Sequence, residues 1–274
     1  MRATVGRVVG VTGAGLLTLA VCVVLGVALG EQPLSLAEAF TDGTTANTIF
    51  WSLRLPRVVL AAVVGAALAA SGSMLQALLR NPLADPFVLG VSGGAALGAT
   101  VALALGVSAS ALGLSGTSLF ALVGAVSATA LVLAVGRSSR EAGTTTTLLA
   151  GVIFNAFALA AIIFIKALVA PDKLGEVLFW LAGSLGHETW PALGLTAGIV
   201  LPAVGVMAAL SPRINLLSLG DDDARSLGVD VERTRLWLLL LASSAVAAAV
   251  ALSGLVGFVG LLVPHLARLV LGAD

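Results

Sequence analysis

The sequence has few charged residues and only one cysteine. Charged residues make up 10% of the 274 positions, and acidic and basic residues balance to a formal net charge of zero. This balance leaves no basic field that would attract nucleic acid, and the lone Cys22 excludes a disulfide within the chain. Apolar residues make up 59% of the chain, which is more than one soluble core can bury. The composition therefore predicts a polytopic membrane protein.

Motifs for nucleotide and metal chemistry are also missing. The chain has no GxxxxGK[ST] phosphate loop, and neither Lys166 nor Lys173 follows a glycine-rich loop, so the chain does not bind ATP in that way. His187 and Glu188 lack the second histidine of an HExxH motif, and the other histidine is far away in the sequence. We therefore predict no catalytic residue, no metal site and no cofactor, and we interpret His187 as a solvated loop residue.

Two uncharged runs near the N-terminus are each long enough to cross a bilayer. Residues 8–30 form a run of 23 and residues 58–79 a run of 22, and at about 1.5 Å per residue either one spans a hydrocarbon core of about 30 Å. The first run is longer than the apolar part of a secretory signal and lacks a convincing cleavage site, so it is predicted to be a retained helix. The connection from Glu31 to Ser52 is predicted to be a polar loop with a short helix near Leu36 to Phe40.

The stretch from Phe87 to Gly136 contains no charged residue and is too long for one crossing. As a single helix its 50 residues would measure about 75 Å, more than twice the thickness of the bilayer core. The Gly- and Ser-rich segment 106–116 therefore divides it into two helices. With similar runs at about 144–169 and 192–210, one beginning at Arg235 and one ending at Gly272, the sequence predicts an all-α fold with eight crossings.

The distribution of basic residues predicts the orientation. Eight crossings place both termini on one side, and that side carries ten arginines in the terminal segments and the even-numbered loops. The opposite side carries only Arg54, Arg57, Lys166 and Lys173. The positive-inside bias therefore places both termini in the cytoplasm and leaves Arg54 and Arg57 outside.

Several segments together carry a resemblance to a known family. They are LRLPR at 53–57, GAALAASGSMLQALLRNPLADPFVLGVSGGAALGA at 65–99, TLLAGVIFNAF at 147–157, FWLAGSL at 179–185, LGVDVERTR at 227–235 and GLVGFVGLLVPHLARLVLG at 254–272. In this order they resemble the permease subunits of ATP-driven importers for iron-siderophores, haem and cobalamin, the FecCD family. That family usually has ten crossings. The resemblance implies that residues 1–274 form a single permease domain that lacks the last two helices.

The resemblance implies alternating-access transport of a ferric siderophore across the bacterial cytoplasmic membrane, with cobalamin or haem as alternative cargo. An extracytoplasmic binding protein would deliver the chelate, a second permease chain of the same or another sequence would complete the path, and cytoplasmic ATPase subunits would hydrolyse ATP. The chain itself would be no enzyme, and its outer surface would contact membrane lipid. An ion-coupled secondary transporter is the alternative of another class, but it would need carboxylates at mid-membrane, and none of the runs has one. An inactive remnant also stays open, because the sequence ends at Asp274.

The segment from Ser211 to Arg235 is the most polar part of the chain. Its three consecutive aspartates would begin a short helix, where carboxylates interact favourably with the helix dipole, and Gly228 would end it. Considered alone, such a charge run is a solvated loop. By resemblance it is the surface that rests in a groove of the ATPase, with coupling residues Asp222, Ala224, Leu227 and Gly228, and with Ala224 and Leu227 on one face.

By resemblance, two further connections form the inner gate at the cytoplasmic end of the path. The gate candidates are Asn81 and Leu83 in the proline-rich turn and Thr144 and Thr145 at a helix start, where threonine also acts as a helix cap. Asn155 is polar within a helix and is expected to face protein or the translocation path.

Three glycines and two arginines complete the predicted sites. Gly90, Gly94 and Gly98 recur every four residues, a spacing that favours close helix packing over contact with cargo. Arg54 and Arg57 are predicted to dock acidic residues of the binding protein, because an arginine pairs well with a carboxylate. The alternative is that both arginines anchor the helix at lipid phosphates.

Overall fold

The computed structural model describes residues 5–30, 36–137, 144–186 and 188–271. Most of these residues are helical, and the only strands among them form the short hairpin of β1 (Ser110–Ala111) and β2 (Leu114–Ser115). The all-α prediction is confirmed.

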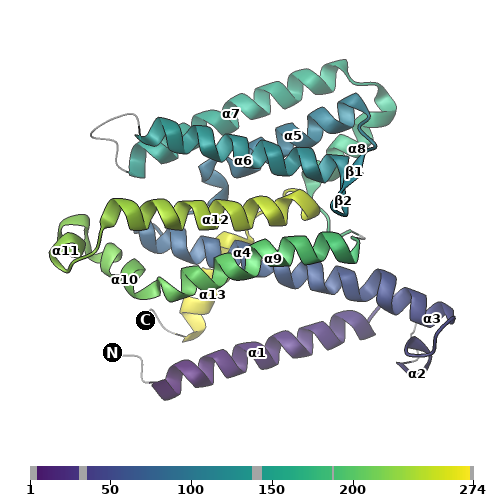
Figure 1. Cartoon of the computed structure of the whole chain (residues 1–274), viewed down its shortest axis with the longest axis horizontal. Helices are drawn as coiled ribbons and strands as arrows, with labels where there is room; N and C mark the ends of the chain where they lie inside the picture. The colour runs from purple at the N-terminus through teal and green to yellow at the C-terminus, as the bar shows by residue number, and fades with distance from the viewer. Residues whose placement is uncertain (1–4, 31–35, 138–143, 187, 272–274) are drawn as a thin grey trace.

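The long helices lie side by side in layers (Figure 1). On one side are α5 (Val91–Leu105), α6 (Gly116–Arg137) and α7 (Thr144–Leu168), and through the middle run α4 (Leu55–Leu78), α9 (Trp190–Ala209) and α12 (Val231–Ser253), with α13 (Val259–Leu271) behind them. The first helix, α1 (Val5–Ala28), runs along the opposite edge. The core follows the middle layer: 72% of the apolar window of α12 is buried, against 6% for α1.

Six helices within the described ranges are long and apolar enough to cross a membrane. The other two expected crossings, α5 and α13, have 15 and 13 residues and measure only about 20 to 22 Å. Each begins after a break in regular helix. Gly90, with φ +83°, stands before α5, and Phe258, with φ +67°, stands before α13. The eight apolar segments are therefore present, but two of them are shorter than a full crossing.

The helix that was predicted to begin after Ser52 begins earlier. After α2 (Leu36–Ala39), helix α3 (Thr45–Thr48) starts where the hydroxyl of Thr44 accepts a hydrogen bond from the amide of Asn47, and it continues through the π-helical segment η1 (Ile49–Arg54) into α4. Phe40, Phe50 and Trp51 pack against each other here, with ring centroids 5.1 to 6.1 Å apart. The prediction of a loop is wrong from Thr45 onward, because a helix cap and aromatic packing stabilise helix in a segment of mixed polarity.

Glycines set the closest contacts between helices. A Cβ on Gly94 would overlap the carbonyl of Gly124 on α6, and one on Gly98 would overlap the carbonyl of Phe120. Gly90 has a different role, because it adopts a left-handed conformation at the turn between the 3₁₀ helix η2 (Pro86–Leu89) and α5. All three glycines therefore lie close to neighbouring helices, and Gly90 in addition makes the turn into α5.

The two ends of the bundle differ in structure (Figure 1). Both termini, α10 (Ser211–Leu219) and α11 (Asp221–Ser226) lie at one end, which we call the α11 end. The opposite end carries α2, α3, the β-hairpin and α8 (Pro171–Ala182), and we call it the α8 end.

Candidate functional site

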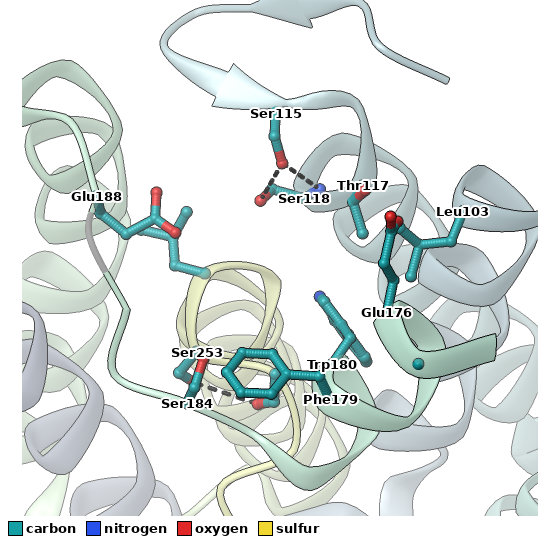
Figure 2. A pocket seen from close by; sticks show the side chains of 13 residues that line it. Leu103, Ser115, Thr117, Ser118, Glu176, Phe179, Trp180, Ser184, Glu188 and Ser253 are labelled. Atoms are coloured by element: carbon teal, nitrogen blue, oxygen red, sulfur yellow. Dashed lines mark hydrogen bonds between the residues drawn. The ribbon is translucent and has the colours of Figure 1, made fainter. Parts of the chain in front are cut away.

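A cavity of about 460 Å³ opens at the α8 end (Figure 2). Its wall combines the hydroxyls of Ser115, Thr117 and Ser118 with the aromatic rings of Phe179 and Trp180. The indole nitrogen of Trp180 points into the space between the hydroxyl-bearing side of the cavity and the aromatic side. A cavity of this size and mixed lining is typical of small-molecule sites in proteins.

The floor of the cavity is a close contact between the end of α8 and the end of α12. Gly183 ends α8 with φ +76°, and the amide of Ser184 donates to the carbonyl oxygen of Ser253 at 2.7 Å. A Cβ on Gly254 would overlap the carbonyl of Trp180. Any larger residue at position 254 would therefore push α8 away from α12 and change the shape of the cavity.

Two carboxylates stand on opposite sides of the cavity (Figure 2). Glu176 on α8 is exposed, whereas Glu188 is half-buried, and burial raises the pKa of the Glu188 carboxyl above its ordinary value. Lys173 lies nearby on α8, but its ammonium donates to the carbonyl oxygen of Ala104 at 3.4 Å. Among the described residues, the two charged groups that line the cavity are both acidic. His187, interpreted above as a loop residue, lies outside the residues that the structure describes.

The proline-rich turn lies at the α11 end and is not helical at its start. Oδ1 of Asn81 accepts from the amide of Leu83 at 2.9 Å, and Oδ1 of Asp85 accepts from the amide of Phe87 at 2.8 Å. Burial raises the pKa of the Asp85 carboxyl, and the hydrogen bond from Phe87 lowers that pKa by less. Leu83 projects at the tip of the turn with 71% of its surface exposed.

The other gate candidates lie on α7. Thr144 begins the helix, but its side chain lies outside the described part, and Thr145 is exposed. Within the described residues no hydrogen bond joins Asn81 or Leu83 to Thr145. Helix α7 instead contacts η2, the segment that follows the turn, where a Cβ on Gly151 would overlap the carbonyl of Val88.

Asn155 connects α7 to the segment that follows the turn. Its Nδ2 donates to the carbonyl oxygen of Phe87 at 3.0 Å, and its Oδ1 accepts from the amide of Gly93 at 3.2 Å. Both polar atoms of the side chain are therefore used within the chain. The side chain therefore contacts protein through both polar atoms, and its place in the translocation path stays a prediction.

The coupling segment folds as the two short helices α10 and α11. Three aspartates occupy the first turn of α11, Gly228 follows it with φ +83°, and Asp230 caps α12 by accepting from the amide of Arg233 at 3.0 Å. Ala224 is fully buried, whereas Leu227 is 58% exposed. The two side chains therefore differ in burial, and of the two only Leu227 is accessible to a partner. The coupling role of this segment stays a prediction.

Two polar residues that the sequence analysis missed hold the α11 end together. Asp221 pairs with Arg235 at 2.9 Å and with Arg80 at 3.5 Å. Gln76, 4% exposed on α4, accepts from Arg268 on α13 and directs its Nε2 toward three carbonyl oxygens, those of Ala84, Gly260 and Leu261. The sequence of three consecutive aspartates does not show which one forms an ion pair. For Gln76, the available signal was a glutamine inside an otherwise apolar run.

Arg54 and Arg57 lie at the α8 end with different surroundings. Nη1 of Arg54 donates to the carbonyl oxygens of Val27 and Ala28 at 3.1 and 3.3 Å, at the C-terminal end of α1. Arg57 is exposed and lines a groove of about 710 Å³ between α1 and α4. Arg54 is thus engaged in holding α1, and Arg57 is the more available of the two for a partner.

Comparison with known proteins assigns the family. Residues 17–274 match the FecCD transport family. The chain is 39% identical over 264 residues to the hemin transport system permease protein HmuU of Yersinia pestis, covering 94% of this chain and 78% of that protein. It is 40% identical over 230 residues to the cobalamin import system permease protein BtuC of Halobacterium salinarum, covering 84% of this chain and 61% of that protein.

A solved structure of a metal-chelate type ABC transporter in an inward-facing conformation has the same fold, with a TM-score of 0.83 and 32% identity over 94% of this chain and 80% of that chain. The family match and the fold agree over nearly the whole length. The chain therefore belongs to the FecCD transport family and is a permease of the ABC-importer type.

Proposed function

We propose that the chain is a single permease domain that carries a metal chelate, first of all a ferric siderophore, across a bacterial cytoplasmic membrane in an ATP-driven importer. The observation that carries the proposal is the match to the FecCD transport family over residues 17–274. The partners are cytoplasmic ATPase subunits, a second permease chain and an extracytoplasmic binding protein. Hemin and cobalamin, named for the two relatives, are the alternative cargoes.

The α11 end faces the cytoplasm in this proposal. In support, basic residues gather in the segments of that end, at Arg80, Arg213, Arg225, Arg233, Arg235 and Arg268. Positive residues concentrate on the cytoplasmic side of membrane proteins. The N-terminus is then cytoplasmic, α10 and α11 meet the ATPase through Asp222, Leu227 and Gly228, and Arg57 meets the binding protein outside.

The cavity at the α8 end supports a cargo of mixed character. Rings of Phe179 and Trp180 suit the apolar faces of a chelate, and the serine and threonine hydroxyls suit its polar edges. Glu176 and Glu188 repel a strongly anionic ligand and favour a neutral or cationic one. A ferric hydroxamate siderophore meets these conditions better than an anionic chelate does.

The turn at Asn81 and Leu83 and the start of α7 at Thr144 and Thr145 form the inner gate of the proposed path. Leu83 and Thr145 are both exposed, and α7 begins at the α11 end (Figure 1), which supports an accessible position for both. Alternating access then requires the gate to open and close as the ATPase binds and hydrolyses ATP. No carboxylate lies at the middle of the six candidate spans, so these spans offer no acidic side chain for coupling to an ion gradient.

The cargo is tested by competition. The full chain, purified with its cognate ATPase and binding protein in proteoliposomes, should accumulate a ferric hydroxamate, and excess unlabelled hydroxamate should compete better than hemin or cobalamin. Trp180→Ala should reduce uptake more than Trp237→Ala, because Trp237 is an exposed tryptophan that does not line the cavity. Preferred uptake of hemin or cobalamin would contradict the siderophore assignment. Equal effects of the two tryptophan variants would show that the cavity is not part of the translocation path.

A further inference from the structure

The carboxylate of Asp221, the first residue of α11, joins two arginines from separate helices. Nη2 of Arg235 on α12 donates to both of its oxygens at 2.9 Å, and Nη2 of Arg80 approaches Oδ1 at 3.5 Å. Arg80 stands just after α4 and directly before the turn that begins at Asn81. Asp221 thus connects the end of α4 with α11 and α12.

The two contacts of Asp221 differ in strength. The side chain of Arg235 is only 17% exposed, and its Nε is buried without a partner among the described residues, so this arginine is held inside the fold. The side chain of Arg80 is 48% exposed and its contact is longer. Exposed ion pairs are weak because water screens them. The Arg235 contact is therefore the persistent one, and the Arg80 contact is the one that can break.

Arg80 is also strained in its backbone. Its φ of +50° is a left-handed value that residues other than glycine rarely adopt. The amide of Arg80 donates to the carbonyl oxygen of Ala77 at 3.3 Å, and the amide of Asn81 donates to that of Gln76 at 3.1 Å. A strained residue persists only where its surroundings fix it. A change in the contact of the Arg80 side chain would therefore change the path of the turn that follows.

We propose that Asp221 is a positioning residue that transmits movement of α11 to the Asn81–Pro86 turn through Arg80. The inference rests on the proposed function, in which α11 meets the ATPase and the turn belongs to the gate. Asp221 stays with Arg235 as α11 moves, and its contact with Arg80 is made in one state of the transporter and broken in the other. A weak contact suits this role, because a ligand or partner shifts an equilibrium only by the difference in its interaction with the two states.

Glu232, in the first turn of α12, provides a matched control. Its carboxylate approaches Arg225 of α11 at 3.8 Å, and its side chain is 86% exposed. This contact joins α11 to the start of α12 and does not reach α4. Glu232→Gln therefore removes a negative charge near α11 without touching the link to the turn or the residues proposed to meet the ATPase.

The test compares Arg80→Gln, Arg80→Lys, Asp221→Asn and Glu232→Gln in the full chain, assembled with its cognate ATPase and binding protein in proteoliposomes. The measured quantity is cargo taken up per ATP hydrolysed. Arg80→Gln and Asp221→Asn should lower this ratio by about two- to fivefold, as expected for loss of a partly exposed ion pair. Arg80→Lys keeps the charge and should retain most of the ratio, and Glu232→Gln should match the original protein.

A second readout follows the turn directly. Spin labels at Leu83 and Leu227, which are exposed at 71% and 58%, report the distance between the turn and α11 during the nucleotide cycle. The original chain should keep a narrow distance distribution in each nucleotide state, and Arg80→Gln should broaden it. An unchanged distribution and an unchanged ratio in Arg80→Gln would overturn this inference alone. Absence of ATPase stimulation in the original complex would overturn the proposed function and this inference with it.

Discussion

Gly72 in α4 lies against the carbonyl oxygen of Gly260 in α13, so closely that a Cβ on Gly72 would overlap that group. Gly260 in turn lies against Pro86, where the proline-rich turn ends. The contact therefore places the short helix α13, the long helix α4 and the turn in one packed unit. Small residues allow this approach of two backbones within a membrane.

Gly72→Ala should destabilise the protein by about 1–3 kcal/mol, because overpacking forces the two backbones apart. Gly65→Ala on the same helix is the matched control, since nothing lies within 4 Å of a Cβ at that position. Thermal unfolding in detergent measures the difference, and Gly65→Ala should match or exceed the stability of the original chain. Equal melting temperatures for the two variants would show that the contact between α4 and α13 is looser than described.

Asn155→Ala should lower stability by roughly 1–2 kcal/mol, because the carbonyl of Phe87 and the amide of Gly93 lose their partner. Ile153→Ala, at a position 61% exposed on the same helix, should cost less although it removes more apolar atoms. If Asn155 instead lines the path, its replacement should change transport while stability stays the same. Parallel measurement of unfolding and uptake separates the two roles.

Glu188 should make stability depend on pH. Its pKa is raised by burial above the ordinary 4.5, so the folded protein holds this proton more tightly than the unfolded chain. The stabilisation contributed by the protonated carboxyl is fully present below pH 4.5 and is lost as the pH rises through the raised pKa. Glu188→Gln should flatten the unfolding profile in that window and raise stability at neutral pH, whereas Ser184→Ala should keep the original slope. If the pH profile of stability in Glu188→Gln is identical to that of the original protein, protonation of Glu188 does not contribute to the pH dependence.

Arg57→Glu should weaken association with the binding protein by about tenfold or more, because it opposes like charges across the docking surface. Arg54→Gln should instead loosen α1, because the Arg54 side chain donates hydrogen bonds to the carbonyls at the C-terminal end of that helix. Binding to the purified transporter in lipid nanodiscs measures the first effect, and protease sensitivity of α1 measures the second. Normal association of the binding protein with Arg57→Glu would contradict the docking role of Arg57 and favour the alternative, in which Arg57 anchors the helix at lipid phosphates.

The helices could be predicted from the sequence because uncharged runs of 20 residues or more have few other structures available in a membrane. The start at Thr45 could not, since it depends on one cap and on the packing of Phe40 with Phe50 and Trp51. The shortness of α5 and α13 could not be predicted either, because hydropathy does not show where a glycine or a strained residue breaks a helix.

The sites were predictable only in part. The polar segment that contains α11 was visible from its charges, and the proline-rich turn from Pro82 and Pro86. The partner of Asp221 was not, because Arg80 is 141 residues away along the chain. The cavity at the α8 end has walls from α5, α6, α8 and α12 and appears only when these segments are assembled.

The most direct test of the account is the energy source of transport. The chain, assembled with its cognate ATPase and binding protein in proteoliposomes, is given iron-labelled ferric hydroxamate, with and without ATP and with and without imposed proton or sodium gradients. We predict accumulation that requires ATP hydrolysis and persists after every ion gradient is dissipated. Accumulation driven by an ion gradient in the absence of ATP would contradict it.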